Sequence, residues 1–524
     1  MNKNKHGAAA SRYEKLAALR EPVLNRARQC AELTIPALFP PEDYDDYNGL
    51  NSANQSLGAK GVNNISSKLM LATLPPNSPF YKIGLNPDLI PPPTGDRETD
   101  NQTEKEQTEI ENALARLEQS LLRDINSSED RSTIAESFKH RIIGGNVLLH
   151  DDEEVGLRLF RLDNYVVVRE YSGKPLEILT RELIPYESLD EDLKEIVDEA
   201  SVDGHETDTD VEEFELFTWL KRDGELWDVH QEIQGSIVPS SIGHIRDDVF
   251  NYYPLRFYKE DGRDYSRSFV EDLYNDLVSY DSLTADIKDA SREMARIIHL
   301  VRPNANVDTE DFEQAESGDV ILASPEDVVP YQMNKFPDLQ FTSAEKQQLK
   351  DDLTHSFLMN SAVQRDAERV TAHEIMYVAQ ELDGGLSGFY SLHDSEFQKP
   401  YLNRKIHLMK KKGRFPKQLT KNDIDLSIIT GVEALGRNQE LQKIDQFLAF
   451  PPNIPPELYI QNIDMNELIK RRETAVGLFG ITKGATQVQE EQQQQMMQQM
   501  GQQLGPEIVK QVGSQVQGGS NNAA

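Results

Sequence analysis

Residues 355–392 read HSFLMNSAVQRDAERVTAHEIMYVAQELDGGLSGFYSL, and the rest of the fold is organised around this stretch. It predicts the end of one helix, a short polar loop and the start of a second helix. The loop, residues 360–370, has neither the alternation of a strand nor an apolar helical stripe. It contains two arginines, Arg365 and Arg369. A polar loop between two helices is held in place by a rigid mount, as functional loops often are.

The helix after the loop has a well-defined start. Thr371 and Glu374 have capping-box spacing, so each side chain can satisfy a free backbone amide of the first turn. Val370 and Ile375 are spaced as a hydrophobic staple across the same cap. One apolar stripe follows at helical spacing, formed by Ile375, Val378, Leu382 and Leu386.

Length and composition predict a soluble protein of two to four domains. The chain has 524 residues, 38% of them hydrophobic, which is enough for at least one large core. No apolar run approaches the ~18 residues of a membrane span, and the first residues lack the apolar segment of a secretory signal. The single cysteine, Cys30, excludes an intramolecular disulfide and a Cys-rich zinc site. We therefore expect a protein made in a reducing cytoplasm, without a membrane partner.

The net charge of −34 narrows the classes of function. An acidic protein of this size repels nucleic acid on average, so DNA binding through a basic face is disfavoured. Acidic enzymes, adaptors and proteins that touch DNA without holding it remain. The acidic stretch 188–213 lacks the ligand spacing of an EF-hand, and we interpret it as a solvated helix and loop.

The pattern along the chain predicts an α+β protein that is mainly helical. Short Val/Leu/Tyr runs between turn residues indicate strands at 144–183, 214–238 and 252–258. A Pro/Asp/Thr-rich linker is expected at 86–104. Helices are expected at 10–35, 56–74, 105–125, 131–143, 423–450 and 456–480. The helix after Thr371 is expected to bend or break at Gly384–Gly385 and Pro400 and to end in the basic run 410–414.

Two further helices enclose a small β-containing module. Residues 268–298 form the longest helical pattern, which is close to a heptad seam. Residues 304–334 show short strands and turns, and a second helix is expected from Thr342, where Glu345 completes capping-box spacing. The seam of the first helix consists of Leu273, Leu277, Tyr280, Leu283, Ile287, Ala290, Met294 and Ile297.

No catalytic motif has the spacing that its chemistry requires. His373-Glu374 begins like a zinc-protease helix, but Tyr377 stands where the second histidine is needed. Gly385–Gly388 and Gly477–Gly484 lack the order of a nucleophile elbow and of a phosphate loop. We therefore predict a protein that is not an enzyme, with no catalytic residues, no metal and no cofactor. Two interpretations of Arg365 and Arg369 remain open. They form ion pairs with adjacent acidic residues, or they contact a ligand.

Five segments occur in the same order in one known family: GAKGVNNISSKLMLATLP (58–75), GGNVLLH (144–150), GRDYSRSFVEDL (262–273), MNSAVQRDAERVTAHEIMYVAQELD (359–383) and GVEALGRNQEL (431–441). Over about residues 10–480 the chain resembles the portal protein, or head-to-tail connector, of short-tailed phages of the T-odd podovirus type. The segment around 362–382 is the most specific part. The stretch 188–213 and the Gln-rich tail show no convincing match.

The resemblance implies a portal fold assembled as a ring with a central channel. The ring is a homo-oligomer, usually of twelve copies, at one capsid vertex. The implied regions are the wing (1–267), the first stem helix (268–301), the clip (302–341), the second stem helix (342–359), the tunnel loop (360–370), the long wing helix (371–430), the crown (431–485) and a partly disordered Gln-rich tail (486–524).

The resemblance also implies a function. The channel would pass double-stranded DNA during packaging and ejection, and the terminase large subunit would dock before the tail tube or adaptor proteins. Scaffolding and major capsid proteins would be further partners, in the host cytoplasm during assembly and then in the virion. Twelve copies would carry a charge of about −400, which keeps DNA centred, while the tunnel-loop residues Gln364, Arg365 and Arg369 touch it. The alternatives are a helical scaffold or adaptor without a channel, and a hydrolase that uses His373, Glu374 or Ser387.

Overall fold

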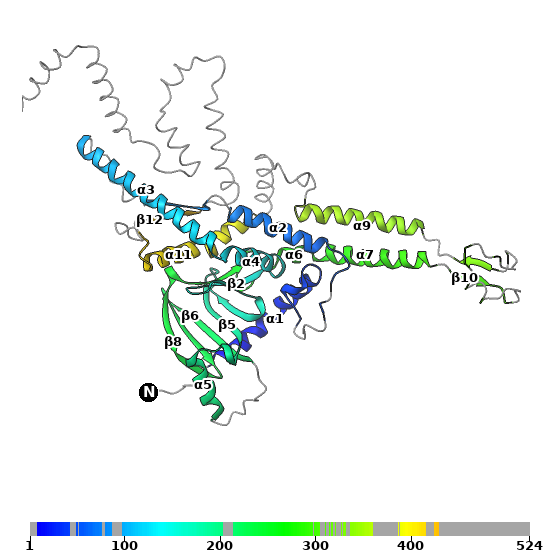
Figure 1. Cartoon of the computed structure of the whole chain (residues 1–524), viewed down its shortest axis with the longest axis horizontal. Coiled ribbons are helices and arrows are strands. Elements are labelled where there is room, and N and C mark those ends of the chain that lie inside the picture. Colours follow the sequence, from blue (N-terminus) through cyan, green and yellow to red (C-terminus); the bar gives the residue numbers. More distant parts are fainter. Residues whose placement is uncertain are drawn as a thin grey trace, which may run out of the picture. The chain divides into compact units, whose positions relative to one another are not determined.

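The structure is a computed structural model of the chain (Figure 1). Contacts divide the chain into two compact units. One comprises Met1–Lys82, Gln119–Leu419 and Leu426–Gly431, and the other Ile83–Glu118, Thr420–Asp425 and Val432–Ala524. The described residues are 8–41, 49–50, 52–75, 79–85, 97–202, 213–296, 298–303, 310, 314, 316–317, 320, 326, 328–331, 336–359, 386, 388–415 and 424–428.

The N-terminal part is helical, as the sequence predicts. The helices are α1 (Ala9–Glu32), α2 (Leu57–Thr73) and α4 (Asp130–Gly144), with a short 3₁₀ helix η1 (Pro36–Leu38) after α1. Helix α4 is followed by Gly145, whose φ of 75° is the left-handed conformation that glycine adopts at low cost.

Helix α3 starts earlier than the sequence analysis expects. It spans Arg97–Ser127, so residues 97–104 of the predicted linker 86–104 are helical. The segment from Arg97 holds Glu, Gln and Lys residues, which have good helix propensity even without an apolar stripe. A polarity pattern alone does not separate such a helix from a linker.

Two antiparallel sheets follow, and both lie where strands are predicted. The smaller has the strand order β3-β2-β9, and the larger has the order β4-β5-β6-β7-β8. Their strands are β2 (Asn146–Asp152), β3 (Gly156–Phe160), β4 (Tyr165–Arg169), β5 (Pro175–Pro185), β6 (Glu213–Asp223), β7 (Leu226–Ile233), β8 (Ser236–Arg246) and β9 (Tyr252–Arg256).

The larger sheet packs helices on both faces. Helix α1 covers one face through Tyr13, which joins a buried cluster with Phe217. Helix α5 (Glu191–Val202) packs through Leu193 and Val197 on a cluster that contains Leu216. Leu216 and Phe217 are adjacent in β6, and adjacent residues of a strand point to opposite faces of its sheet. The two helices therefore cover opposite sides of the sheet. The predicted helix in the acidic stretch 188–213 is thus confirmed for its first half.

The paired-helix region differs from its prediction at both ends of the module (Figure 1). The first helix is divided into α6 (Phe269–Asp272) and α7 (Tyr274–Ala295), and residues 298–301 form strand β10 instead of continuing it. Strand β10 (Ile298–Val301) pairs antiparallel with β11 (Val328–Tyr331). Helix α9 spans Phe336–Ser356, so the prediction that it starts at Thr342 is wrong.

Local interactions explain why these helices begin at other residues than the sequence pattern predicts. Pro337, in the first turn of α9, is pre-set for a helix and needs no amide partner. Thr342 lies inside the helix, where its hydroxyl donates to the carbonyl of Asp338 at 3.0 Å. The capping box that does form is at Ser268, whose hydroxyl accepts from the Glu271 amide while the Glu271 carboxylate accepts from the Ser268 amide.

The C-terminal helix passes Pro400 without ending. Residues 388–393 are helical, a π-helical turn η6 covers Asp394–Gln398, and α11 (Lys399–Lys411) continues the helix. The wider turn places the amide-free proline in the first turn of α11, where no hydrogen bond is lost. The helix ends at Lys411, and β12 (Ile424–Ile428) pairs with β1 (Tyr81–Leu85). Residues 424–428 are therefore not helical, contrary to the predicted helices 371–430 and 423–450.

Three buried histidines predict that acid destabilises the fold. Burial lowers the pKa of His140 to about 3 and that of His150 to about 4. Burial, together with the charge of Arg141, lowers the pKa of His393 well below its ordinary value. Each group stays neutral in the folded chain but is protonated in the unfolded chain below about pH 6.5. The free energy of unfolding should therefore fall between about pH 6.5 and pH 4, by up to about 1.4 kcal/mol per pH unit for each histidine.

Denaturant unfolding at pH 7 and pH 5 measures this effect. In His393→Asn an amide oxygen can accept the hydrogen bond that Arg141 donates to the His393 Nδ1, so the loss between the two pH values should shrink. His244→Asn is the matched control, because the His244 side chain is 65% exposed. An equal pH dependence in His393→Asn and wild type would contradict the assignment.

Candidate functional site at the paired helices

The register of α7 and α9 is given by two contacts at different points along the pair. The rings of Phe269 and Phe357 lie 6.0 Å apart, and the Lys346 ammonium lies 5.7 Å from the ring centre of Tyr280. Tyr280 follows Phe269 by eleven positions, and Phe357 follows Lys346 by eleven positions. The two helices are therefore antiparallel and in step, and they form a rod with the β10–β11 hairpin at one end (Figure 1).

The predicted seam residues are buried only near the start of the rod. Leu277 and Tyr280 are buried, whereas Leu273, Leu283, Ile287 and Met294 are each partly exposed in the single chain. Thr284 is buried as well and was missed by the sequence analysis. Its hydroxyl donates to the Tyr280 carbonyl at 2.7 Å, which lets a polar residue occupy an apolar seam.

The base of α9 is held by α2. The ring of Phe357 lies directly over Gly61, where an added Cβ would be 2.3 Å from the ring. The Asn64 side-chain amide donates to the carbonyls of Phe357 and Leu358 at 2.9 and 3.1 Å, and the Lys68 ammonium donates to the Leu358 carbonyl. These contacts hold the last residues described before the loop 360–370.

Leu358 shows how tightly this end is fixed. Its φ of 54° is the left-handed conformation, which a branched side chain rarely adopts. The turn closes with a hydrogen bond from the Met359 amide to the Thr354 carbonyl at 2.8 Å. The cost of this conformation, on the order of 1 kcal/mol, is offset by the Asn64 and Lys68 contacts. This turn therefore fixes the direction in which the chain leaves α9.

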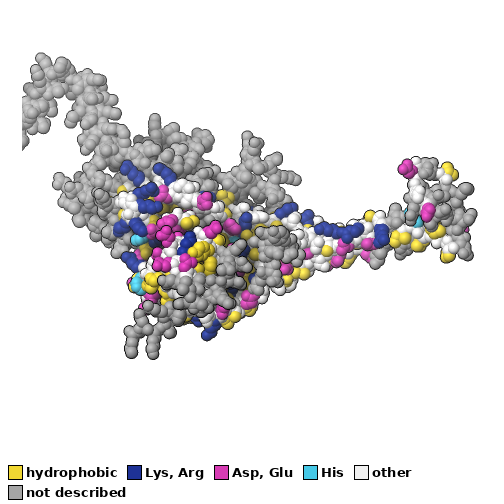
Figure 2. Space-filling view, turned by 60° about the horizontal axis from the view of Figure 1, so that its bottom comes forward, with side chains coloured by type: hydrophobic (Ala, Val, Ile, Leu, Met, Phe, Trp, Pro, Cys, Tyr) yellow, Lys and Arg dark blue, Asp and Glu magenta, His cyan; other side chains and the backbone are white. Residues whose placement is uncertain are grey.

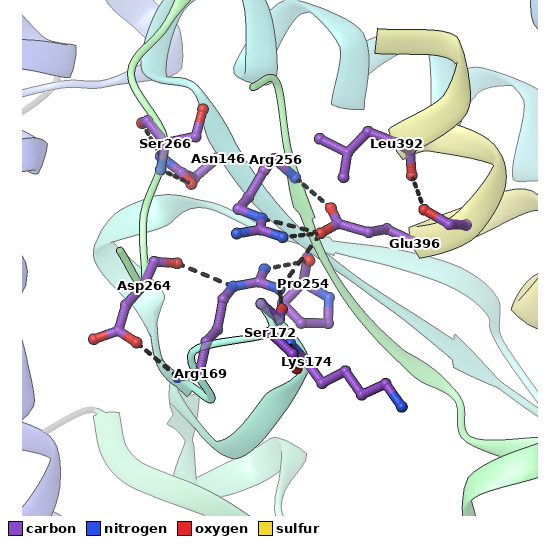
Figure 3. Close-up of polar contacts among 12 residues, drawn as sticks. Asn146, Arg169, Ser172, Lys174, Pro254, Arg256, Asp264, Ser266, Leu392 and Glu396 are labelled. Carbon is purple, nitrogen blue, oxygen red and sulfur yellow. Dashed lines mark hydrogen bonds and ion pairs between the residues drawn. The ribbon is translucent and has the colours of Figure 1, made fainter. Parts of the chain in front are cut away.

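A second junction joins the smaller sheet to the start of the rod. The Asn146 side chain donates to the Ser266 carbonyl at 2.7 Å and accepts from the Ser266 amide at 2.9 Å (Figure 3). A Cβ on Gly145 would lie 2.5 Å from the Ser266 carbonyl oxygen, so only glycine allows this approach. The segments 144–150 and 262–273, both chosen from sequence as family motifs, meet here.

The π-helical turn supplies a carboxylate, that of Glu396, to the same region. Glu396 accepts from the Arg256 backbone amide at 3.0 Å and from its guanidinium at 2.9 and 2.6 Å (Figure 3). Arg169 lies 3.5 Å from Glu396 and donates to the Pro254 carbonyl, while the Asp264 carboxylate accepts from its backbone amide. The guanidinium groups are buried, so these charges stabilise the fold only as a complete set.

Helix α11 is tied to α4 and β2 by another buried set of charges. The Lys405 ammonium lies 3.0 Å from Asp130 and 2.8 Å from Asp151, and the Tyr401 hydroxyl donates to Asp130 at 2.5 Å. Burial alone would lower the pKa of Lys405, but Asp151 and Asp130 outweigh it and raise that pKa. Burial raises the pKa of Asp151, whereas Lys405 and Tyr401 outweigh burial at Asp130 and lower its pKa.

The remaining predicted site residues lie outside the described residues. These are the tunnel-loop residues Gln364, Arg365 and Arg369, and the cap residues Val370, Thr371, Glu374 and Ile375. Within the described part of the chain, no group of three or more His, Cys, Asp or Glu residues could hold a metal ion. None of the described helices is long and apolar enough to cross a membrane.

Comparison with known proteins defines the family. The family described as "Bacteriophage head to tail connecting protein" matches residues 6–479. The chain belongs to this family, which confirms the resemblance seen in the five sequence segments and the predicted role as a structural connector.

Relatives in this family are portal proteins. The portal protein of Escherichia phage T7 is 32% identical over 495 residues, covering 92% of this chain and 89% of its own length. The portal protein of Enterobacteria phage T3 is also 32% identical and covers 90% and 87% of the two chains. A chain in the virion of a gene transfer agent particle aligns over 80% of this chain and 89% of its own, at 12% identity and a TM-score of 0.37.

The contact between Gly61 and Phe357 generates a test. Gly61→Ala should destabilise the chain by about 1–3 kcal/mol, because the new methyl group overlaps the ring and forces the end of α9 to move. Gly388→Ala is the control: that position is also helical, and nothing lies within 4 Å of its added Cβ. Alanine there should be neutral or stabilising by up to about 1 kcal/mol. Chemical unfolding of both variants measures the difference, and equal effects would refute the packing.

Proposed function

We propose that copies of this chain assemble into a closed ring around a channel for double-stranded DNA, at one vertex of a phage capsid. Family membership and the 32% identity to two portal proteins over nine-tenths of the chain support this proposal. The observation that carries it structurally is the rod. Helices α7 and α9 are in antiparallel register, bear a β hairpin at one end, and are fixed at the other end by α2 and α6.

The proposed regions follow the secondary structure. The stem consists of α6–α7 and α9, that is, residues 269–295 and 336–356, and the clip is the segment between them with β10 and β11. The sheets and the helices α1, α2, α4, α5 and α11 form the wing. The loop 360–370 begins directly after the anchored turn at Leu358, so a fixed base would direct it toward the channel axis.

In this proposal the protein is not an enzyme. Its wall repels the DNA phosphates, because the chain carries a net charge of −34, and DNA slides through without being held. Energy for packaging comes from an ATP-driven terminase large subunit that docks on the clip, and tail tube or adaptor proteins take its place later. Scaffolding and major capsid proteins contact the wing in the host cytoplasm during assembly, and the mature ring belongs to the virion.

Imaging of the purified protein tests the ring. Negative-stain class averages should show a closed ring with a central opening, and native mass spectrometry should give one closed copy number, which we expect to be twelve. A protein that stays monomeric under all assembly conditions would favour the alternative, a helical scaffold or adaptor without a channel.

The tunnel loop has its own test. The double variant Arg365→Ala, Arg369→Ala should form rings as wild type does but retain less packaged DNA, because the loop loses its phosphate contacts. Genome length and retention in purified particles measure this outcome. Particles with wild-type genome length and retention would assign the two arginines to local ion pairs with Asp366 and Glu368.

A further inference from the structure

The rod has two flanks of opposite charge. Tyr280 faces α9, and each following residue is rotated by about 100° around the helix axis. Lys288 and Arg292 therefore lie about 80° and 120° to one side of the seam, and Asp286 lies about 120° to the other side. On α9, rotation is counted from Leu349. Lys350 then lies about 100° to one side, and Asp352 lies about 60° to the other side.

The antiparallel arrangement brings like charges together. In two antiparallel helices that face each other, residues rotated in the same sense from the contact line lie on the same side of the pair. Lys288, Arg292 and Lys350 thus share one flank, and Lys346 reaches this flank across the Tyr280 ring. We call this set the basic flank. Figure 2 shows Lys and Arg side chains gathered along one line of the rod and Asp and Glu side chains along another.

The opposite side is the acidic flank. It consists of Asp276, Asp286 and Glu293 of α7 and Glu345 and Asp352 of α9, all of which are exposed. Phe341 also lies on this flank, and 73% of its surface is exposed. An aromatic side chain this exposed, surrounded by charged groups, is typical of an interface anchor.

Few of these charges are neutralised within the chain. Among the described residues, none of the five acidic-flank carboxylates has a basic partner, and Lys350 has no acidic one. On the basic flank, Lys288 donates to the Asn54 carbonyl, and Arg292 pairs with Asp289 at 3.1 Å while both remain exposed. One carboxylate also lies on this flank: Asp281, rotated by about 100° from Tyr280, accepts from the Asn54 side-chain amide at 3.1 Å. The same chain therefore exposes two complementary surfaces on opposite sides of one rigid element.

We propose that the basic flank of one copy docks on the acidic flank of the next copy, with Phe341 buried at the contact. This inference rests on the proposed ring, because two different surfaces that meet head to tail generate a ring when the rotation closes. A single exposed ion pair contributes little, about 0–1 kcal/mol, so the charges mainly set direction and register. The contact repeats at every position around the ring.

Charge reversal on each flank tests the proposal. One variant carries Arg292→Glu and Lys350→Glu, and the other carries Asp286→Lys and Glu345→Lys. Each should fold as wild type does but lose ring yield about tenfold, since two attractive pairs become repulsive at every contact. An equimolar mixture should recover rings, because copies with two acidic flanks alternate with copies that have two basic flanks. Native mass spectrometry of mass-labelled variants should find equal numbers of each.

The control is Lys15→Glu with Lys221→Glu, which reverses two exposed charges on α1 and β6, away from the rod. It should assemble normally. Wild-type ring yield from either reversed variant alone would overturn the proposal. Normal rings of Arg292→Glu, Lys350→Glu that retain less DNA would also overturn it, because the basic flank would then face the duplex. If wild-type protein forms no ring, the proposed function itself fails, which separates that failure from a wrong flank assignment.

Discussion

The close approach of Phe357 to Gly61 is the constraint on which the paired helices depend. A side chain at position 61 would occupy the space of the ring, so the family segment 58–75 needs glycine there for packing. Once the ring is seated, Asn64 and Lys68 reach the carbonyls at the end of α9, and Leu358 is held in a left-handed turn. The absence of a side chain at Gly61 thus fixes the base of the rod and the direction in which the chain leaves it.

Charge is used differently in the body and in the rod. In the body, Asp130 and Asp151 are buried beside Lys405, and the buried guanidinium of Arg256 meets Glu396, so removal of one partner would leave an unpaired buried charge. Along the rod, most charges face solvent without a partner among the described residues. The acidic groups behind the net charge of −34 therefore have two roles. Buried carboxylates hold elements together, and exposed carboxylates remain available to another molecule.

Local patterns predicted most elements but placed several ends wrongly. Thr342 and Glu345 have the spacing of a capping box, yet the helix begins at Phe336, because Pro337 starts a helix as well as a threonine does. Pro400 predicted a bend or a break, and the structure has a π-helical turn directly before it, after which the helix continues. Of the seven seam candidates that the structure describes, only Leu277 and Tyr280 are buried, since one neighbouring helix leaves the other sides of α7 exposed.

By itself the sequence determined the family, the mixed helical and sheet composition, and the helices on either side of a small β module. Periodicity and caps are properties of neighbouring residues, so they can be read along the chain. Only the tertiary structure decided that Asn146 meets Ser266, that Gly61 receives Phe357, and that the charges of α7 and α9 separate onto two flanks. Those facts depend on which helix faces which and in what direction, and no local pattern contains that information.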